Sequence, residues 1–191
     1  MQNVKALIFD VFGTVVDWRR GIAREAEAFL GRQKGLDLDW EAFADAWRGK
    51  YQPAMEPIRK GKRPFTKLDV LHRENLLQVL EEYSITGLSE AEVDHLNTAW
   101  HRLPPWPDSV PGLLRLKSKF IIGTQSNGNI ALMVNMAKNG GLPWDVILGS
   151  EVVQAYKPQP EAYRRACEAL GLPPSQVMMT AAHNNDLAAA K

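Results

Sequence analysis

Short, unbroken apolar runs recur along the chain and predict the strands of a buried sheet. Four such runs occur, at Ala6 to Phe9, Phe120 to Gly123, Val146 to Gly149 and Val177 to Thr180. Because their hydrophobicity is continuous rather than alternating, we expect strands that are covered on both faces, as in parallel sheets. Helical patterns over 129–139 and 159–170 separate the last three runs. The pattern therefore predicts an α/β fold with a doubly wound parallel sheet.

The segment between the first two runs has a different pattern, with no strand signal and several helical ones. Phe43, Trp47 and Tyr51 are spaced four apart and would line one face of a helix. A helical block that follows the first strand of an α/β core indicates an inserted domain. The expected division is a helical domain over 15–98 and a discontinuous α/β core over 1–14 and 99–191. The pattern stops at Lys191 within a helix-like segment, so we expect the core to be truncated there.

Composition and charge narrow the class of protein further. The chain has 191 residues, enough to bury a core, and its 23 Lys and Arg balance 22 Asp and Glu, so no basic field attracts nucleic acid. No segment approaches the ~18 consecutive apolar residues of a membrane span, and we expect no signal peptide before the first strand. The single cysteine, Cys167, excludes an internal disulfide. We expect a soluble, cytoplasmic protein without nucleic-acid or membrane partners.

Polar residues follow the predicted strands, where parallel α/β sheets bind their ligands. Asp10 comes directly after the first strand, and Thr14 supplies a hydroxyl one turn later. An aspartate here can be a turn residue, but its carboxylate can also attack carbon or phosphorus as a nucleophile. Ser126 and Asn127 follow the second strand, where a helix begins whose free N–H groups favour an anion. An ordinary helix cap explains that stretch equally well.

Two later segments complete the set of candidate residues. Lys157 precedes a proline and so belongs to a loop, where it can either face solvent or keep a neighbouring carboxylate ionised. A polar cluster that includes His183, Asn185 and Asp186 follows the last predicted strand. Asp186 also suits the start of any helix, and a histidine in such a place is more often structural than catalytic.

The order and placement of these segments together resemble the haloacid dehalogenase superfamily, and most closely its hydrolytic L-specific 2-haloacid dehalogenases. The resemblance covers nearly the whole chain and implies a Rossmann-like core with a helical cap. Phosphatases of the superfamily carry D-x-D-G-T, whereas this chain has Phe12 at the second acidic position, where it cannot protonate a leaving oxygen. Their magnesium motif, aligned on Asp186, places Ala182 at a ligand position. The resemblance thus implies a dehalogenase without metal or cofactor.

The same resemblance implies roles in the first chemical step. Asp10 would attack the halogen-bearing carbon of a short 2-haloalkanoic acid and form an aspartyl ester. Lys157 would keep Asp10 ionised, and Thr14 would orient its carboxylate. Phe12 would line a dry pocket for the carbon–halogen bond. Halide, which leaves as a stable anion, needs no acid.

Further residues would bind the substrate and complete the second step. Ser126 and neighbouring N–H groups would bind the substrate carboxylate, and Asn127 with Arg48 would hold the departing halide. Asp186 would position or activate the water that releases a 2-hydroxy acid, and His183 would share that task, because histidine side chains in general can act as bases near neutral pH. The remaining site residues are Tyr163, which matches a family tyrosine near the lysine, and Asn185.

Other functions remain compatible with the same residues. A related hydrolase can use the same aspartate to open a strained ring or split another carbon–heteroatom bond. A magnesium-dependent phosphatase fits less well, and a non-catalytic binding protein is a reading that the short C-terminus favours. Relatives are commonly dimers, and the six tryptophans would permit an apolar homodimer interface.

Overall fold

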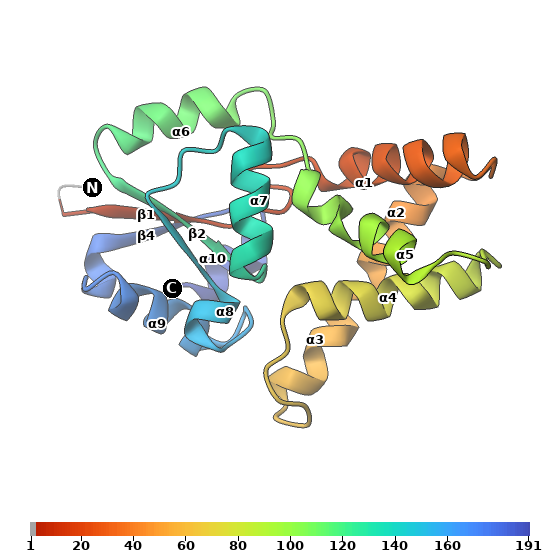
Figure 1. The fold of residues 1–191 in the computed structure, drawn as a ribbon. Helices are drawn as coiled ribbons and strands as arrows, with labels where there is room; N and C mark the ends of the chain where they lie inside the picture. The colour runs from red at the N-terminus through yellow and green to blue at the C-terminus, as the bar shows by residue number, and fades with distance from the viewer. Residues whose placement is uncertain (1–2) are drawn as a thin grey trace.

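The computed structural model describes residues 3–191 and has a four-stranded parallel sheet within its α/β part, beside a block of helices (Figure 1). The strands are β1 (Ala6–Phe9), β2 (Ile121–Ser126), β3 (Val146–Gly149) and β4 (Val177–Thr180), in the order β3-β2-β1-β4. Ala6 of β1 lies opposite Ile121 of β2 on one side and Val177 of β4 on the other. β1 is therefore an inner strand, and its carboxyl end opens between two neighbours.

The predicted strands are confirmed, with one difference at β2. This strand begins at Ile121 and continues to Ser126, three residues beyond the apolar run from which it was predicted. Its last half is polar but buried, because neighbouring groups supply hydrogen bonds. Thr124 Oγ1 donates to Leu148 O at 2.7 Å, and Gln125 Nε2 donates to Ala162 O at 2.7 Å. Buried polar side chains with partners do not disturb a strand, but they hide it from a hydrophobicity pattern.

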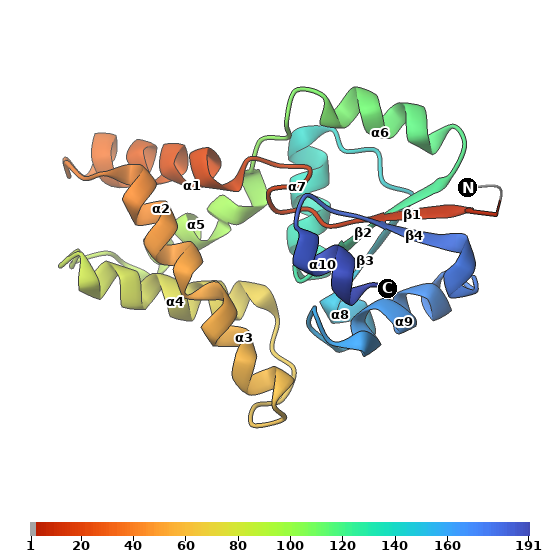
Figure 2. The same ribbon diagram turned by 180° about the vertical axis from the view of Figure 1, so that it is seen from behind.

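Helices cover both faces of the sheet, so the doubly wound α/β architecture is confirmed (Figures 1 and 2). Leu7 and Phe9 of β1 share one apolar cluster with residues of α6 (Ser109–Lys117) and α7 (Ile130–Gly140). Ile8, whose side chain points the other way, packs with residues of α9 (Pro160–Ala169). The shorter elements of this part are α8 (Ser150–Val153), the 3₁₀ turn η3 (Pro174–Gln176) and α10 (Asn184–Ala189).

A block of helices lies beside the carboxyl ends of the strands (Figure 2) and is called the cap below. It comprises α1 (Trp18–Ala26), the π-helix η1 (Glu27–Gln33), α2 (Trp40–Gly49), α3 (Tyr51–Arg59), α4 (Leu68–Glu82), α5 (Glu90–Asn97) and the 3₁₀ helix η2 (Thr98–Arg102). Side chains cap several of these helices. Asp39 accepts a hydrogen bond from Ala42 N at 2.9 Å, and Ser89 with Glu92 forms a capping box.

The expectation that Phe43, Trp47 and Tyr51 line a single helix is wrong in its last member. α2 ends at Gly49, and Tyr51 is the first residue of α3. Glycine is a poor helix former, and Pro53 fits in the first turn of a new helix, where its missing N–H is not needed. All three aromatic side chains are nevertheless buried, so the break redirects the chain without exposing them. Within residues 3–191, the structure has no helix long and apolar enough to span a membrane.

Candidate active site

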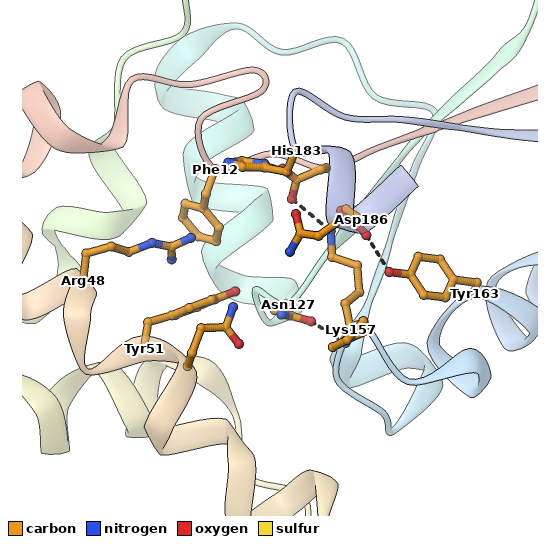
Figure 3. Close-up of a pocket in the computed structure, with 12 residues that line it drawn as sticks. Phe12, Arg48, Tyr51, Asn127, Lys157, Tyr163, His183 and Asp186 are labelled. Atoms are coloured by element: carbon orange, nitrogen blue, oxygen red, sulfur yellow. Dashed lines mark hydrogen bonds and ion pairs between the residues drawn. The ribbon is translucent and has the colours of Figure 1, made fainter. Parts of the chain in front are cut away.

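A cavity of ≈110 Å³ lies where the carboxyl ends of the strands meet the cap (Figure 3). Nine of the eleven residues predicted from the sequence line it, while Thr14 and Ser126 lie outside its lining. The nine are Asp10, Phe12, Arg48, Asn127, Lys157, Tyr163, His183, Asn185 and Asp186. They come from five separate segments of the chain, and the fold alone brings them together.

Asp10 occupies the first position after β1, and its carboxylate is held from several sides. Its backbone N–H donates to Thr180 O at 3.0 Å, which continues the pairing with β4. Oδ2 accepts a hydrogen bond from Thr14 Oγ1 at 2.8 Å. Thr14 Oγ1 in turn accepts from Ala182 N at 3.0 Å, so the hydroxyl has a fixed direction. Gly13, with φ of +83°, makes the turn that returns Thr14 to the carboxylate.

Lys157 supplies the positive charge of the site. Its Nζ donates to Asp10 Oδ1 at 2.9 Å and to Asp186 Oδ2 on the other side. Burial by itself would lower the pKa of Lys157, but the charges of the two carboxylates outweigh it and raise that pKa above its ordinary value. The lysine is therefore a permanent cation at physiological pH and cannot serve as a base.

The same contacts determine the charge of Asp10. Burial by itself would raise the pKa of this carboxyl group, but the charge of Lys157 and the hydrogen bonds from Lys157 and Thr14 hold the pKa below its ordinary value. Asp10 is thus an ionised, largely desolvated carboxylate. Such a group is a stronger nucleophile than a hydrated one, because fewer water hydrogen bonds must be broken when it attacks.

Asp186 lies in the first turn of α10 and accepts hydrogen bonds on both of its oxygens. Besides the bond from Lys157, Oδ1 accepts one from Tyr163 Oη at 2.5 Å. Burial raises the pKa of Tyr163, and the bond to the Asp186 carboxylate adds to that rise, so the tyrosine stays a neutral donor. His183, at the N-cap of α10, places Nδ1 2.9 Å from Asp10 Oδ2 and is about half exposed.

Arg48 enters the cavity from the cap and is surrounded by aromatic rings. Its Cζ lies 3.8 Å from the centre of the Tyr51 ring, 5.4 Å from that of Trp18 and 5.6 Å from that of Phe12. Among residues 3–191, no hydrogen-bond acceptor meets its buried Nη1. A buried guanidinium nitrogen without a partner is costly, so this corner of the cavity suits an anion.

Ser126 ends β2 and Asn127 follows it, and the two differ in their access to the cavity. Asn127 Oδ1 accepts from the backbone N–H of Lys157 at 2.8 Å, which leaves the amide nitrogen as the donor of this side chain. Ser126 is buried beside the cavity, and its Oγ accepts from Gly128 N at 3.0 Å. The N–H of Gly128 is therefore occupied, and Ser126 can reach a ligand only through its hydroxyl hydrogen.

The residues present do not fit a magnesium site of the phosphatase kind. Phe12 and Ala182 offer no side-chain oxygen, and the ammonium of Lys157 lies between the carboxylates of Asp10 and Asp186. Over residues 3–191, no cluster of three or more His, Cys, Asp or Glu side chains has a metal-binding arrangement. Phe12 instead packs edge-to-face against Trp100, with ring centres 5.8 Å apart.

The sequence interpretation missed three residues that line the cavity, Tyr51, Gln52 and Pro158. Tyr51 was assigned to helix packing, although its ring stacks on the guanidinium of Arg48. The available signal was Arg48, which directly follows Trp47 and so lies beside the aromatic stripe rather than on the opposite face of the helix. Gln52 carries no comparable signal, because its place depends on the break between α2 and α3.

Comparisons with known proteins show which family this chain resembles. A family model described as haloacid dehalogenase-like hydrolase matches residues 4–191. The crystal structure of a defluorinating L-2-haloacid dehalogenase is similar with a TM-score of 0.95 and 54% identity, over 98% of this chain and 77% of that one. (S)-2-haloacid dehalogenase 4A from Burkholderia cepacia is 26% identical over all of this chain and 80% of its own length. A phosphoglycolate phosphatase from Neisseria meningitidis is 27% identical over all of this chain and 77% of its own length.

Proposed function

The chain belongs to the haloacid dehalogenase-like hydrolases, and from that premise we propose that it hydrolyses the carbon–halogen bond of short 2-haloalkanoic acids without a metal. The sequence relatives include dehalogenases and a phosphatase at similar identity, so the residues of the site must decide between them. One observation carries the proposal. The carboxylate of Asp10, ionised by Lys157, faces a cavity in which Phe12 stands where a phosphatase needs its acid.

In the first step, a carboxylate oxygen of Asp10 attacks the carbon that bears the halogen. A carbon–oxygen bond forms, the carbon–halogen bond breaks, and the halogen leaves with the bonding electrons as halide. Attack from the side opposite the halogen inverts the configuration at that carbon. The proposed position of the halide is beside Arg48 and Asn127, because Arg48 Nη1 meets no acceptor within the described part of the chain and the Asn127 amide nitrogen is left as a donor.

In the second step, water attacks the carbonyl carbon of the aspartyl ester. The ester bond breaks, the 2-hydroxy acid leaves, and the Asp10 carboxylate is restored, with one proton to be removed from the water. Two groups near the ester can take that proton, the carboxylate of Asp186 and the imidazole of His183. Lys157 contacts the nucleophile throughout and neutralises the charge that develops on its oxygen.

The size of the cavity supports the proposed substrate class. A space of ≈110 Å³ accommodates an acid of two or three carbons with its halogen, and the rings of Phe12 and Tyr51 form part of its lining. We propose the (S)-enantiomer as the substrate, by analogy with the (S)-2-haloacid dehalogenase that matches the whole chain.

Halide release tests this proposal. The protein is incubated in EDTA with chloroacetate, fluoroacetate and each enantiomer of 2-chloropropionate, and Asp10→Asn serves as the matched control. We expect halide from (S)-2-chloropropionate, with (R)-lactate as the product, and none from the variant. Turnover of a phosphate ester that requires added magnesium, with no halide from any acid, would instead establish the phosphatase.

A further inference from the structure

The backbone of Lys157 is held by side chains rather than by secondary structure. It lies in the turn between α8 and α9, outside any helix or strand. On the sheet side, its N–H donates to Asn127 Oδ1 at 2.8 Å. On the cap side, its carbonyl oxygen accepts from Arg59 Nε at 3.1 Å. Arg59 is the last residue of α3, so a cap residue contacts the backbone of the lysine that holds Asp10.

The guanidinium of Arg59 also joins this turn to the wall of the cavity. Its Nη2 donates to Gln52 Oε1 at 2.6 Å, and its Nη1 lies 3.3 Å from Glu56 Oε2. Gln52 lines the cavity seven residues earlier on the same helix. The planar guanidinium presents its donors in fixed directions, so the bond to Gln52 constrains the direction of the bond to Lys157.

A second hydrogen bond joins the same two parts, the end of α3 in the cap and the turn that holds Lys157 in the core. This contact between cap and core is called the seam below, and here the donor lies on the core side. Gln159 Nε2, two residues after Lys157, donates to the carbonyl oxygen of Arg59 at 3.1 Å. Each side of the seam thus donates from a side chain to a backbone carbonyl of the other. Both bonds form together only when α3 lies in its observed place against the turn.

From these contacts we propose that Arg59 is a positioning residue, through which the seating of the cap on the core sets the place of the Lys157 ammonium between Asp10 and Asp186. The inference rests on the proposed function in one respect, namely that Lys157 keeps the nucleophile Asp10 ionised. Arg59 itself is outside the cavity lining and acts through the lysine backbone. If the cap moved away from the core, Arg59 would release the Lys157 carbonyl and the Lys157 ammonium would be held less firmly beside Asp10. The attack of Asp10 on the substrate carbon would therefore be coupled to cap closure.

Other bonds tie the cap to the core without touching Lys157, and they provide controls. Tyr156 Oη donates to Thr66 O at 2.6 Å. Lys67 Nζ pairs with Glu151 Oε1 at 2.7 Å and is more than half exposed. Removal of the Lys67 pair weakens the same seam while it leaves the backbone of Lys157 and the cavity unchanged.

The titration of Lys157 is a readout that a merely structural role of Arg59 would leave unchanged. Four titratable groups surround its ammonium. They are Asp10 after β1, Tyr163 of α9, Asp186 of α10, and His183 at the N-cap of α10. The carboxylates raise the pKa of Lys157 through close contact. A displaced ammonium would lose part of that contact while it stays buried, and its pKa would fall.

The experiment compares Arg59→Met, Arg59→Lys and Lys67→Met with the unaltered chain. We measure halide release against pH, the titration of the Lys157 ammonium by NMR, and the midpoint of thermal unfolding. We expect Arg59→Met to lower kcat about tenfold, the order expected for one lost hydrogen bond to a positioned group, with KM changed less than about twofold. Its Lys157 should titrate at lower pH, Arg59→Lys should recover part of the loss, and Lys67→Met should match the unaltered chain.

Two results would overturn the inference. One is an Arg59→Met protein with unaltered kcat and unaltered Lys157 titration. The other is an equal loss in Lys67→Met, which would show that any weakening of the seam has this effect. If the Arg59 variants do not fold, Gln159→Leu removes the reciprocal bond, and we expect a smaller change in the same direction; no change there would also count against the inference.

The design separates this inference from the proposed function. If the unaltered chain releases no halide from any acid, the proposed function fails, and the NMR titration still decides whether Arg59 positions Lys157. If halide is released but Lys157 titrates at the same pH in Arg59→Met as in the unaltered chain, the proposed function stands and the positioning inference fails.

Discussion

The ammonium of Lys157 lies 2.9 Å from Oδ1 of Asp10, and about nine-tenths of each side chain is removed from solvent. Transfer of two charges from water to such a place is costly, and their attraction offsets that cost only when the remaining hydrogen-bonding capacity is also used. Here Thr14 bonds to the second oxygen of Asp10, and Asp186 accepts from the same ammonium. The pair thus forms the centre of a network in which two carboxylates share one cation.

Removal of that cation should destabilise the protein in a pH-dependent way. In Lys157→Met, two buried carboxylates lose their partner, and we expect the free energy of unfolding at pH 7 to fall by about 3–5 kcal/mol. The folded-state pKa of Asp10 is lowered, so its contribution is present above the ordinary value of 3.8 and is lost as pH falls through the lowered pKa. The difference between the two proteins should therefore shrink on acidification.

At alkaline pH the contribution of Lys157 to the free energy of unfolding changes with pH in the opposite direction. The folded-state pKa of Lys157 is raised, so its contribution is complete below the ordinary value of 10.5 and is lost as pH rises through the raised pKa. Urea unfolding from about pH 3 to about pH 12 follows both effects, because the raised pKa of Lys157 lies above 10.5, with Lys67→Met as the matched control for an exposed pair. A stability difference that stays constant over this range would show that the charges of the network are not responsible.

Much of the fold could be predicted because its cause is local. The apolar runs of β1, β3 and β4 are continuous in the sequence, and a parallel sheet necessarily places their carboxyl ends on one edge. That argument brings Asp10, Asn127 and the segment around His183 to the same region, whereas the approach of Lys157 to Asp10 was implied only by the family resemblance. The buried polar half of β2 escaped notice, since the hydrogen bonds that permit it come from residues 24 and 37 positions away.

The parts that could not be predicted depend on how the cap meets the core. Gln52 and Arg59 are ordinary polar residues on an amphipathic helix, and nothing in their spacing indicates the turn at Lys157. Their roles follow from the break at Lys50, which redirects α3 toward that turn. Likewise, the burial of Ser126 beside the cavity follows from the close turn of Gly128 onto its hydroxyl oxygen.

Phe12 should affect binding more than chemistry. Its ring packs edge-to-face on Trp100 and forms part of the aromatic enclosure of Arg48. We expect Phe12→Ala to raise KM about tenfold with a smaller fall in kcat, and to lower the free energy of unfolding by about 3–5 kcal/mol through the void it leaves. Phe12→Leu, which keeps most of the volume, should lose less than about 1.5 kcal/mol. Steady-state kinetics and urea unfolding of both variants test this, and a fall in kcat alone would contradict it.

Activity should require the planar guanidinium group of Arg48, and another positively charged side chain should not replace it. Its flat group stacks on Tyr51, and no acceptor in residues 3–191 occupies Nη1, so Nη1 can bind an anion in a geometry that an ammonium cannot reproduce. We expect Arg48→Lys to lower kcat ten- to a hundredfold and to weaken inhibition by added chloride or bromide. Arg20→Lys, at an exposed position of α1, is the matched control. Unaltered halide inhibition in Arg48→Lys would place the halide elsewhere in the cavity.

The last prediction separates the two candidates for water activation. Loss of the group that takes the proton from water slows hydrolysis of the ester but leaves its formation intact, so one equivalent of halide should appear in a burst. We expect that burst in Asp186→Asn, because Asp186 is buried among the groups that surround the ester and is joined to Asp10 through Lys157. His183→Asn should turn over steadily at a reduced rate, since His183 is half exposed and water can take the place of its imidazole. Intact-protein mass spectrometry after the burst would detect the acid attached to Asp10, and a burst in His183→Asn instead would assign the base to the histidine.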